Sequence, residues 1–245
     1  MIKLNLNLEN SKFTIQTLAA LKEGEFEEGN DFSVDLNNEL KVMLERLNVT
    51  FNIINTAIVR EDWLAMLALL VRMRVYLMNL SGVFSNTAED IATLLKMPMV
   101  FSSESLSKVM KYKLSCSEDS SLKIDINLNE FKLIIKKINA LEQKVAESSP
   151  WFVNYELNLN EYFLEKTNSL GGSIGAANKK LSSGEYVESV YHLKKICLFS
   201  MELSIFFDQM MEDVGKVIWS EEFNFPEFSE DYTIPEYYDL PEFMR

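Results

Sequence analysis

His192 is the only histidine in the chain, and histidine is the side chain that most often moves protons near neutral pH. It lies in the sequence YHLKK, within a segment of helical periodicity, and the matching position in an internal repeat is Leu69. A residue that stands where the repeat has leucine is expected on the partly buried face of a helix. No Ser-His-Asp or Cys-His system can be assembled from it, so we predict no catalytic residue and no enzymatic activity.

A glycine-rich stretch, Leu170 to Gly175, is the one pattern that could hold a phosphate or a dinucleotide. It lacks both the Lys-Ser/Thr pair of a phosphate-binding loop and the spacing of a Rossmann turn. We expect these glycines to allow close packing or to break a helix. The sequence therefore predicts no bound cofactor.

Carboxylate and thiol groups give no metal-binding pattern either. The pairs Glu89-Asp90 and Glu212-Asp213 occupy matching positions, where they could cap a helix or line a metal site. A structural role is favoured because no histidine lies near them and the spacing is not that of a calcium loop. Cys116 and Cys197 fall at non-equivalent places, which predicts two free thiols and no metal site.

The C-terminal tail, residues 221–245, differs in composition from the rest of the chain. From Ser220 to Arg245 there are seven aromatic residues and eight acids against one arginine. A pattern of apolar residue, Pro, Glu and aromatic residue occurs three times there. Such a segment presents paired hydrophobic anchors on a stiff backbone, which loses little entropy when it docks in a groove. We expect it to bind a partner protein or a sister subunit, although packing on the chain's own helices is equally compatible. The predicted partner-binding residues are Phe225, Pro226, Phe228, Ile234, Pro235, Tyr237, Tyr238, Leu240, Pro241 and Phe243.

The elements that would position these residues form an internal duplication. Residues 2–21 and 122–141 share seven of twenty positions at a shift of 120. Leu36-Asn37 can then be set over Leu157-Asn158, and from Leu47/Leu170 to Phe84/Phe207 the matches continue at a shift of 123. Chance explains poorly why three blocks match in the same order with nearly the same shift.

Each copy begins with alternating apolar and polar residues, which predicts a strand over 2–9 and over 122–128. A helix, a short extended piece (FSVDL from Phe32, FVNYEL from Phe152) and two long helices follow. The turns between the long helices are marked by Arg60-Glu61-Asp62 and by residues 182–185. We predict a helix-rich α+β fold with pseudo-twofold symmetry, in which strand-helix-strand-helical hairpin units occupy residues 1–115 and 116–220.

The segment AIVREDWLAMLALLVRMRVYLMNLSGVF resembles the helical hairpins of flagellin-export chaperones. The resemblance covers one hairpin in each half. The predicted strands and the duplication depart from that family, so the resemblance implies a helical hairpin and carries no assignment of function.

Composition limits the function classes. The net charge of -13 disfavours direct binding to nucleic acid or to anionic lipid. The most apolar stretch, from Trp63 to Leu80, is interrupted by Arg72 and Arg74, and the start of the chain lacks a secretory signal. We expect a cytoplasmic protein, with association to a virion left open, and no membrane partner.

The predicted function is that of a non-enzymatic protein-binding or assembly protein, such as an adaptor, a chaperone or a phage or virion component. Its partner would be another protein or a second copy of the chain. The alternative is an acidic inhibitor that mimics nucleic acid and blocks a host nucleic-acid-binding protein.

Overall fold

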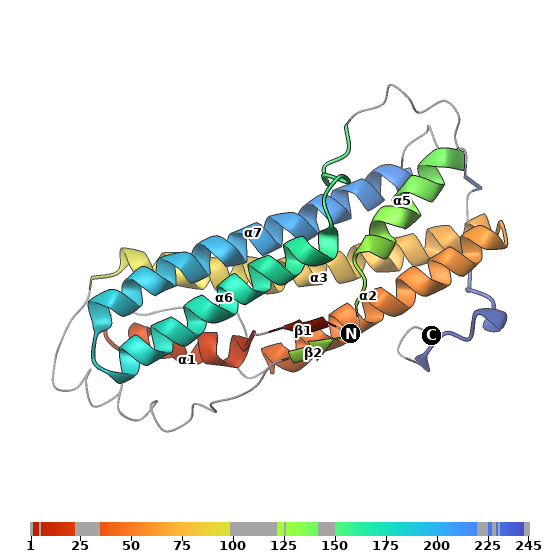
Figure 1. Ribbon diagram of the computed structural model, residues 1–245. Helices are drawn as coiled ribbons and strands as arrows, with labels where there is room; N and C mark the ends of the chain where they lie inside the picture. Colours follow the sequence, from red (N-terminus) through yellow and green to blue (C-terminus); the bar gives the residue numbers. More distant parts are fainter. Residues whose placement is uncertain are drawn as a thin grey trace.

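The computed structural model describes residues 2–4, 6–22, 35–98, 122–124, 126–141, 150–219, 225–226, 229 and 231–242. Long helices run along an elongated body, and the C-terminal segment lies at one end of it (Figure 1). The elements in chain order are β1 (Ile2–Leu4), α1 (Leu8–Ala19), α2 (Leu36–Val59), α3 (Trp63–Lys96), β2 (Leu122–Ile124), α5 (Asn129–Leu141), α6 (Leu159–Ser182), α7 (Tyr186–Trp219) and the 3-10 turn η2 (Glu236–Tyr238).

The predicted α+β class is wrong, because the described residues form a helical protein. Their strand structure is limited to β1 and β2, which pair as an antiparallel ribbon of three residues each. The alternating pattern of residues 2–9 predicted a longer strand. However, the Asn7 side chain accepts a hydrogen bond from the Asn10 amide at 3.2 Å and starts α1 at Leu8.

The second predicted strand of the second copy, FVNYEL from Phe152, is a series of bends and turns. The Asp213 carboxylate accepts the amides of Phe152 at 2.8 Å and Val153 at 3.0 Å. The Asn154 side chain accepts the Glu156 amide at 3.0 Å. Side-chain oxygens therefore accept the backbone amides that would otherwise donate to a neighbouring strand. Of its counterpart, FSVDL, residues 32–34 lie outside the described residues, and α2 begins at Leu36.

The two predicted turns between long helices are confirmed. α2 ends at Val59 and α3 begins at Trp63, while α6 ends at Ser182 and α7 begins at Tyr186. Because α2 and α6 begin at Leu36 and Leu159, one shift of 123 relates both hairpins along their full length. The sequence match of Leu36 with Leu157 was therefore two residues out of register. The glycines Gly172 and Gly175 neither break α6 nor lie against a neighbour.

α3 packs against α7 in the most extensive contact between elements. In α3 the buried side chains recur every three or four residues, as expected for a helix with one apolar face. Equivalent residues of the two copies meet at this contact. The hydroxyls of Ser81 and Ser204 are 2.9 Å apart, and the rings of Phe84 and Phe207 stack with centroids at 6.1 Å. In the ribbon, Lys3 likewise pairs with Lys123. A pseudo-twofold axis therefore passes through both the ribbon and the centre of the α3–α7 pair.

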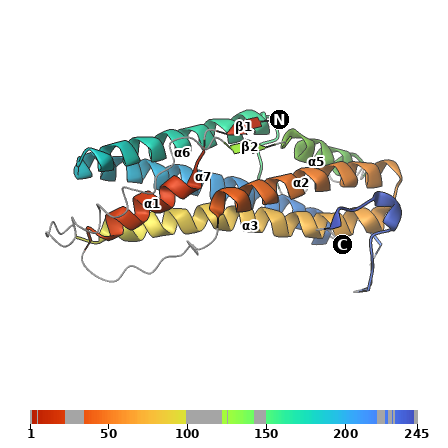
Figure 2. The same cartoon turned by 90° about the horizontal axis from the view of Figure 1, so that it is seen from below.

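The first helix of each copy packs on the other copy as well as on its own. α1 contacts α6 more extensively than it contacts α2 or α3 taken singly, and α5 contacts α2 more extensively than α6 (Figures 1 and 2). The equivalent residues Asn55 and Asn178 make these cross-copy contacts. Asn55 donates to the Glu130 carboxylate at 3.1 Å, and Asn178 donates to the Asn10 carbonyl at 3.2 Å. The two copies are therefore interlocked.

In the part of the chain that the structure describes, α3 is the helix long and apolar enough to cross a membrane. Half of its most apolar window is buried inside the protein. A helix in the core of a globular protein can have the same length and apolar composition.

Asp213 provides a test of how residues 152–155 are held. Its carboxylate is fully buried and accepts the hydroxyl of Tyr155 at 2.8 Å as well as two backbone amides. In Asp213→Asn the amide group of the new side chain must face one of these donors. We expect the free energy of unfolding to fall by roughly 2 kcal/mol.

The measurement is urea denaturation followed by circular dichroism. Glu212→Gln is the matched control, because it removes the neighbouring carboxylate from an exposed position. Equal stability of the two variants would show that Asp213 does not hold this segment.

Candidate functional site at the turn between α2 and α3

The turn between α2 and α3 consists of Arg60, Glu61 and Asp62. Glu61 adopts a left-handed backbone with a φ of 56°. At the matching turn of the second copy this conformation belongs to Gly184, with a φ of 78°. Glutamate in this conformation costs on the order of 1 kcal/mol, whereas glycine adopts it without steric cost. The first copy therefore places a charged residue where the second copy, in a turn of the same length, has glycine.

The C-terminal tail docks on this turn, at the end of the body where α2 meets α3 (Figures 1 and 2). Three of the predicted partner-binding side chains, Ile234, Tyr238 and Leu240, are buried against the chain itself. Phe225 is half-buried, with its ring centroid 6.3 Å from that of Trp63. Pro226 and Tyr237 are exposed, and Pro235 and Pro241 are half-buried. Phe228 and Phe243 lie outside the described residues.

The Asp62 carboxylate joins the tail to the body. One oxygen, Oδ1, accepts the Ala65 amide at 3.1 Å and so caps the start of α3. The other oxygen, Oδ2, accepts the hydroxyls of Tyr237 at 2.8 Å and Tyr238 at 2.9 Å. One carboxylate thus serves both the helix and the docked tail.

Arg60 completes the polar contact with the two tyrosine rings. Its guanidinium carbon lies 4.9 Å from the Tyr237 ring centroid and 5.4 Å from that of Tyr238, which is the geometry of a cation–π interaction. The chain turns sharply after Tyr238, where Asp239 adopts a left-handed φ of 48° and donates its amide to the Glu236 carbonyl at 2.9 Å. This turn directs Leu240 back to the body, where its side chain is buried.

The pKa values at the site follow from these contacts. Burial alone would raise the pKa of Asp62, but the hydrogen bonds from Ala65, Tyr237 and Tyr238 outweigh it and lower that pKa. The pKa of Tyr237 is raised chiefly because its hydroxyl donates to Asp62. Burial, followed by the bond to Asp62, raises the pKa of Tyr238. The docked state therefore favours a charged carboxylate and two neutral phenols.

The other residues considered for chemistry do not gather at this turn. His192 is half-buried on α7, edge-on to Tyr191, and Cys197 is a free thiol whose pKa is raised by burial. Cys116 lies outside the described residues. Asp90 and Asp213 are buried in the second half of α3 and α7, so neither caps a helix start. Within the described ranges no group of three or more His, Cys, Asp or Glu could hold a metal ion.

The turn residues Arg60 and Asp62 were not among the predicted site residues. Their signal in the sequence is the difference between the two copies: Arg-Glu-Asp at one turn stands where the other has Ser-Gly-Glu. Both turns have an acid at the third position, Asp62 or Glu185, so Arg60 is the member of the pair that marks the first turn as different.

Asp62→Asn should loosen the tail while preserving α3. Asparagine is as good a helix cap as aspartate, but its neutral oxygen is a weaker acceptor for the two phenols. We expect docking to weaken by about 1 kcal/mol, so that the amides of Tyr238 and Asp239 exchange with deuterium about fivefold faster. Hydrogen-exchange mass spectrometry resolves this difference. Asp35→Asn, at the cap of α2, is the control and should leave the tail unchanged.

Docking should also weaken in acid. The pKa of Asp62 is lowered in the docked state. The stabilisation that its carboxylate gives to docking is therefore present above the ordinary aspartate pKa and is lost as the pH falls through the lowered value. The NMR positions of the Tyr238 and Asp239 amides should be constant from neutral pH down to about 5 and move toward those of a released tail below about 4. A transition of the same size in Asp62→Asn would contradict this origin.

The site joins two features that the chain supplies by itself: a charged turn and an aromatic, proline-containing segment that fits it. No family model, no curated protein and no solved structure matches the chain. Its function must therefore be inferred from these contacts.

Proposed function

We propose that this chain is a non-enzymatic protein-binding or assembly protein that acts in the cytoplasm. The observation that carries the proposal is the docking of an apolar, proline-containing, tyrosine-rich segment on the α2–α3 turn. A body that holds such a segment from its own C-terminus can hold one of the same chemistry from another chain. The tail, once released, is in turn free to dock on another copy or on a partner.

The contacts favour exchange of this kind over permanent attachment. The polar part of the site is shallow: Tyr237 remains 59% exposed while its hydroxyl binds Asp62. Exposed charge-assisted contacts contribute little free energy each, so Ile234, Tyr238 and Leu240 supply most of the affinity. Three buried side chains on a short peptide suit a reversible contact.

The preorganised backbone supports recognition of an extended segment. Pro235 directly precedes η2, and Pro241 directly follows Leu240. Proline limits the conformations that the free segment must give up on docking. A partner peptide of the form apolar-Pro-Glu-Tyr-Tyr would share this advantage.

Affinity capture from the source cells tests the proposal with three baits: the full chain, a chain that ends after Ser220, and full-length Asp62→Asn. A partner that binds the α2–α3 turn should be recovered more strongly with the truncated chain, whose turn is uncovered. A partner that binds the tail should be enriched by Asp62→Asn and lost on truncation.

A synthetic peptide of residues 225–245, added to the truncated chain, provides the direct control. It should compete with the first kind of partner and bind with an affinity that Asp62→Asn lowers. Recovery of the same partners at the same level by all three baits would mean that neither the turn nor the tail carries recognition.

A further inference from the structure

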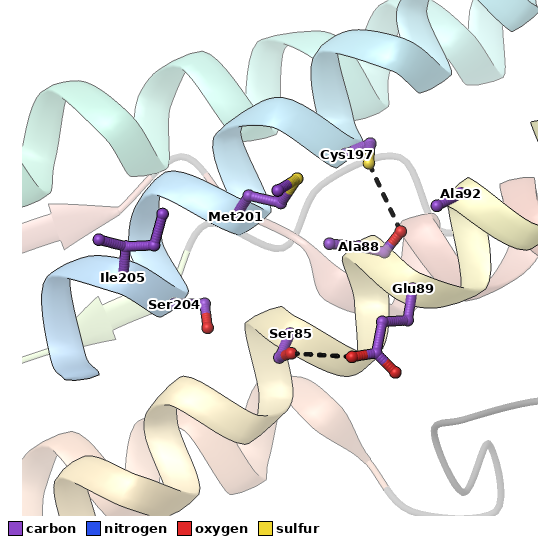
Figure 3. Close-up of a pocket in the computed structure, with 8 residues that line it drawn as sticks. All are labelled: Ser85, Ala88, Glu89, Ala92, Cys197, Met201, Ser204 and Ile205. Carbon is purple, nitrogen blue, oxygen red and sulfur yellow. Dashed lines mark hydrogen bonds between the residues drawn. The ribbon is translucent and has the colours of Figure 1, made fainter.

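A groove lies between α3 and α7, away from the tail, with a cavity volume of about 250 Å³ (Figure 3). Its lining is mostly apolar and comes from both helices. Ser85, Ala88, Glu89 and Ala92 line it from α3, and Cys197, Met201, Ser204 and Ile205 line it from α7. The Cys197 thiol is 3.5 Å from the Ala88 carbonyl, and the Ser85 hydroxyl donates to Glu89 at 3.3 Å.

The pseudo-twofold relation gives this groove a counterpart that an aromatic side chain partly covers. At a shift of 123, Ala92 corresponds to Gly215 and Cys197 to Arg74. Trp219 packs directly on Gly215, where an added Cβ would lie 3.1 Å from its ring. The Arg74 guanidinium carbon lies 4.7 Å from the centroid of the same ring. An indole stacked with a cation, although 63% exposed, therefore lies over the place that is open on the other side.

The copies differ in the residues of the stacked pair and also at Ala88, which lines the groove where the second copy has the larger Met211. Lys96, which is exposed, stands where the second copy has Trp219, and Cys197 stands where the first has Arg74. The small residue beneath the aromatic ring is kept, as Ala92 in place of Gly215. The frame of the filled site is thus retained without the aromatic and basic side chains that fill it.

The surface around the groove extends beyond what a small molecule would cover. Leu198, Met201 and Ile205 are each about half exposed, with exposed fractions from 49% to 52%. These apolar positions lie along α7 at the groove. Exposed apolar surface of this kind marks contact sites for macromolecules.

We propose that the groove binds a partner protein through an aromatic side chain, Trp or Tyr, that lies beside an Arg or Lys. The aromatic ring lies over Ala92 slightly further out than Trp219 lies over Gly215, because the Ala92 Cβ takes up part of that space. The basic group meets Glu89, whose carboxylate is exposed on the rim. The chain's own Trp219 and Arg74 show the chemistry that this frame accommodates.

Capped dipeptides provide the probes for a test by NMR, with the methionine methyl groups as reporters. Met201 lines the groove, and Met78 is its pseudo-equivalent with the same exposed fraction of 49%, so it serves as an internal control. Acetyl-Arg-Trp-amide should shift the Met201 methyl in a saturable way and leave Met78 in place. Acetyl-Glu-Trp-amide should bind several-fold more weakly, and acetyl-Arg-Ala-amide should not bind.

Two variants separate shape from charge. Lys96→Trp combined with Cys197→Arg rebuilds the filled site in the groove and should abolish the Met201 response. Glu89→Gln leaves the shape intact and should remove the preference for the arginine dipeptide over the glutamate one, which keeps the test open if the double variant does not fold.

Equal shifts at Met201 and Met78, or no shift at either, would overturn the proposal. Self-association that the double variant abolishes, together with no response to acetyl-Arg-Trp-amide, would assign the groove to a second copy of this chain and would also overturn it. Neither outcome depends on the tail or on Asp62, so failure here is distinguishable from failure of the proposed function.

Discussion

The packing of α3 against α7 is the contact on which the rest of the structure depends. Each of these helices is the second of its hairpin, and each has its apolar face covered by the other copy. Phe84 and Phe207 stack at the centre and are fully buried, so the core of either hairpin is completed only when both are present. The hydroxyls of Ser81 and Ser204 satisfy each other beside this stack, which allows two polar groups at the middle of an apolar contact.

The packing of α1 on α6 and of α5 on α2 follows from that contact. Once α3 and α7 lie antiparallel, α6 lies beside the start of the first copy and α2 beside the start of the second. The short strands then meet across the axis. A ribbon of three residues per strand has too few hydrogen bonds to be stable by itself. It forms because its own side chains Leu4 and Ile124 are buried in the core, and because the helices that follow its strands pack on the opposite hairpin.

The duplication, the long helices and their turns could be predicted because each depends on local periodicity or on capping residues. The fold class could not, because alternation over 2–9 does not tell a strand from a short strand that runs into a helix. The cap by Asn7 decides between them, because its side chain accepts the Asn10 amide and starts α1 inside the alternating stretch. The bends at 152–157 depend on Asp213, which lies 60 residues further along the chain and so leaves no local signal.

The candidate site shows the same limit. The tail's composition predicted a docking segment, on a partner or on the chain itself, and its expected anchors included Ile234, Tyr238 and Leu240. The surface on which it lies could not be predicted, because Arg60 and Asp62 are brought to it by the fold. Both this site and the α3–α7 groove lie where the two copies differ. At the turn, the first copy has Arg60 and Glu61 where the second has Ser183 and Gly184. At the groove, it has lysine where the second copy has the tryptophan that fills the matching place. A duplicated frame fixes the positions of paired sites, and substitutions at those positions then make the two members of each pair different.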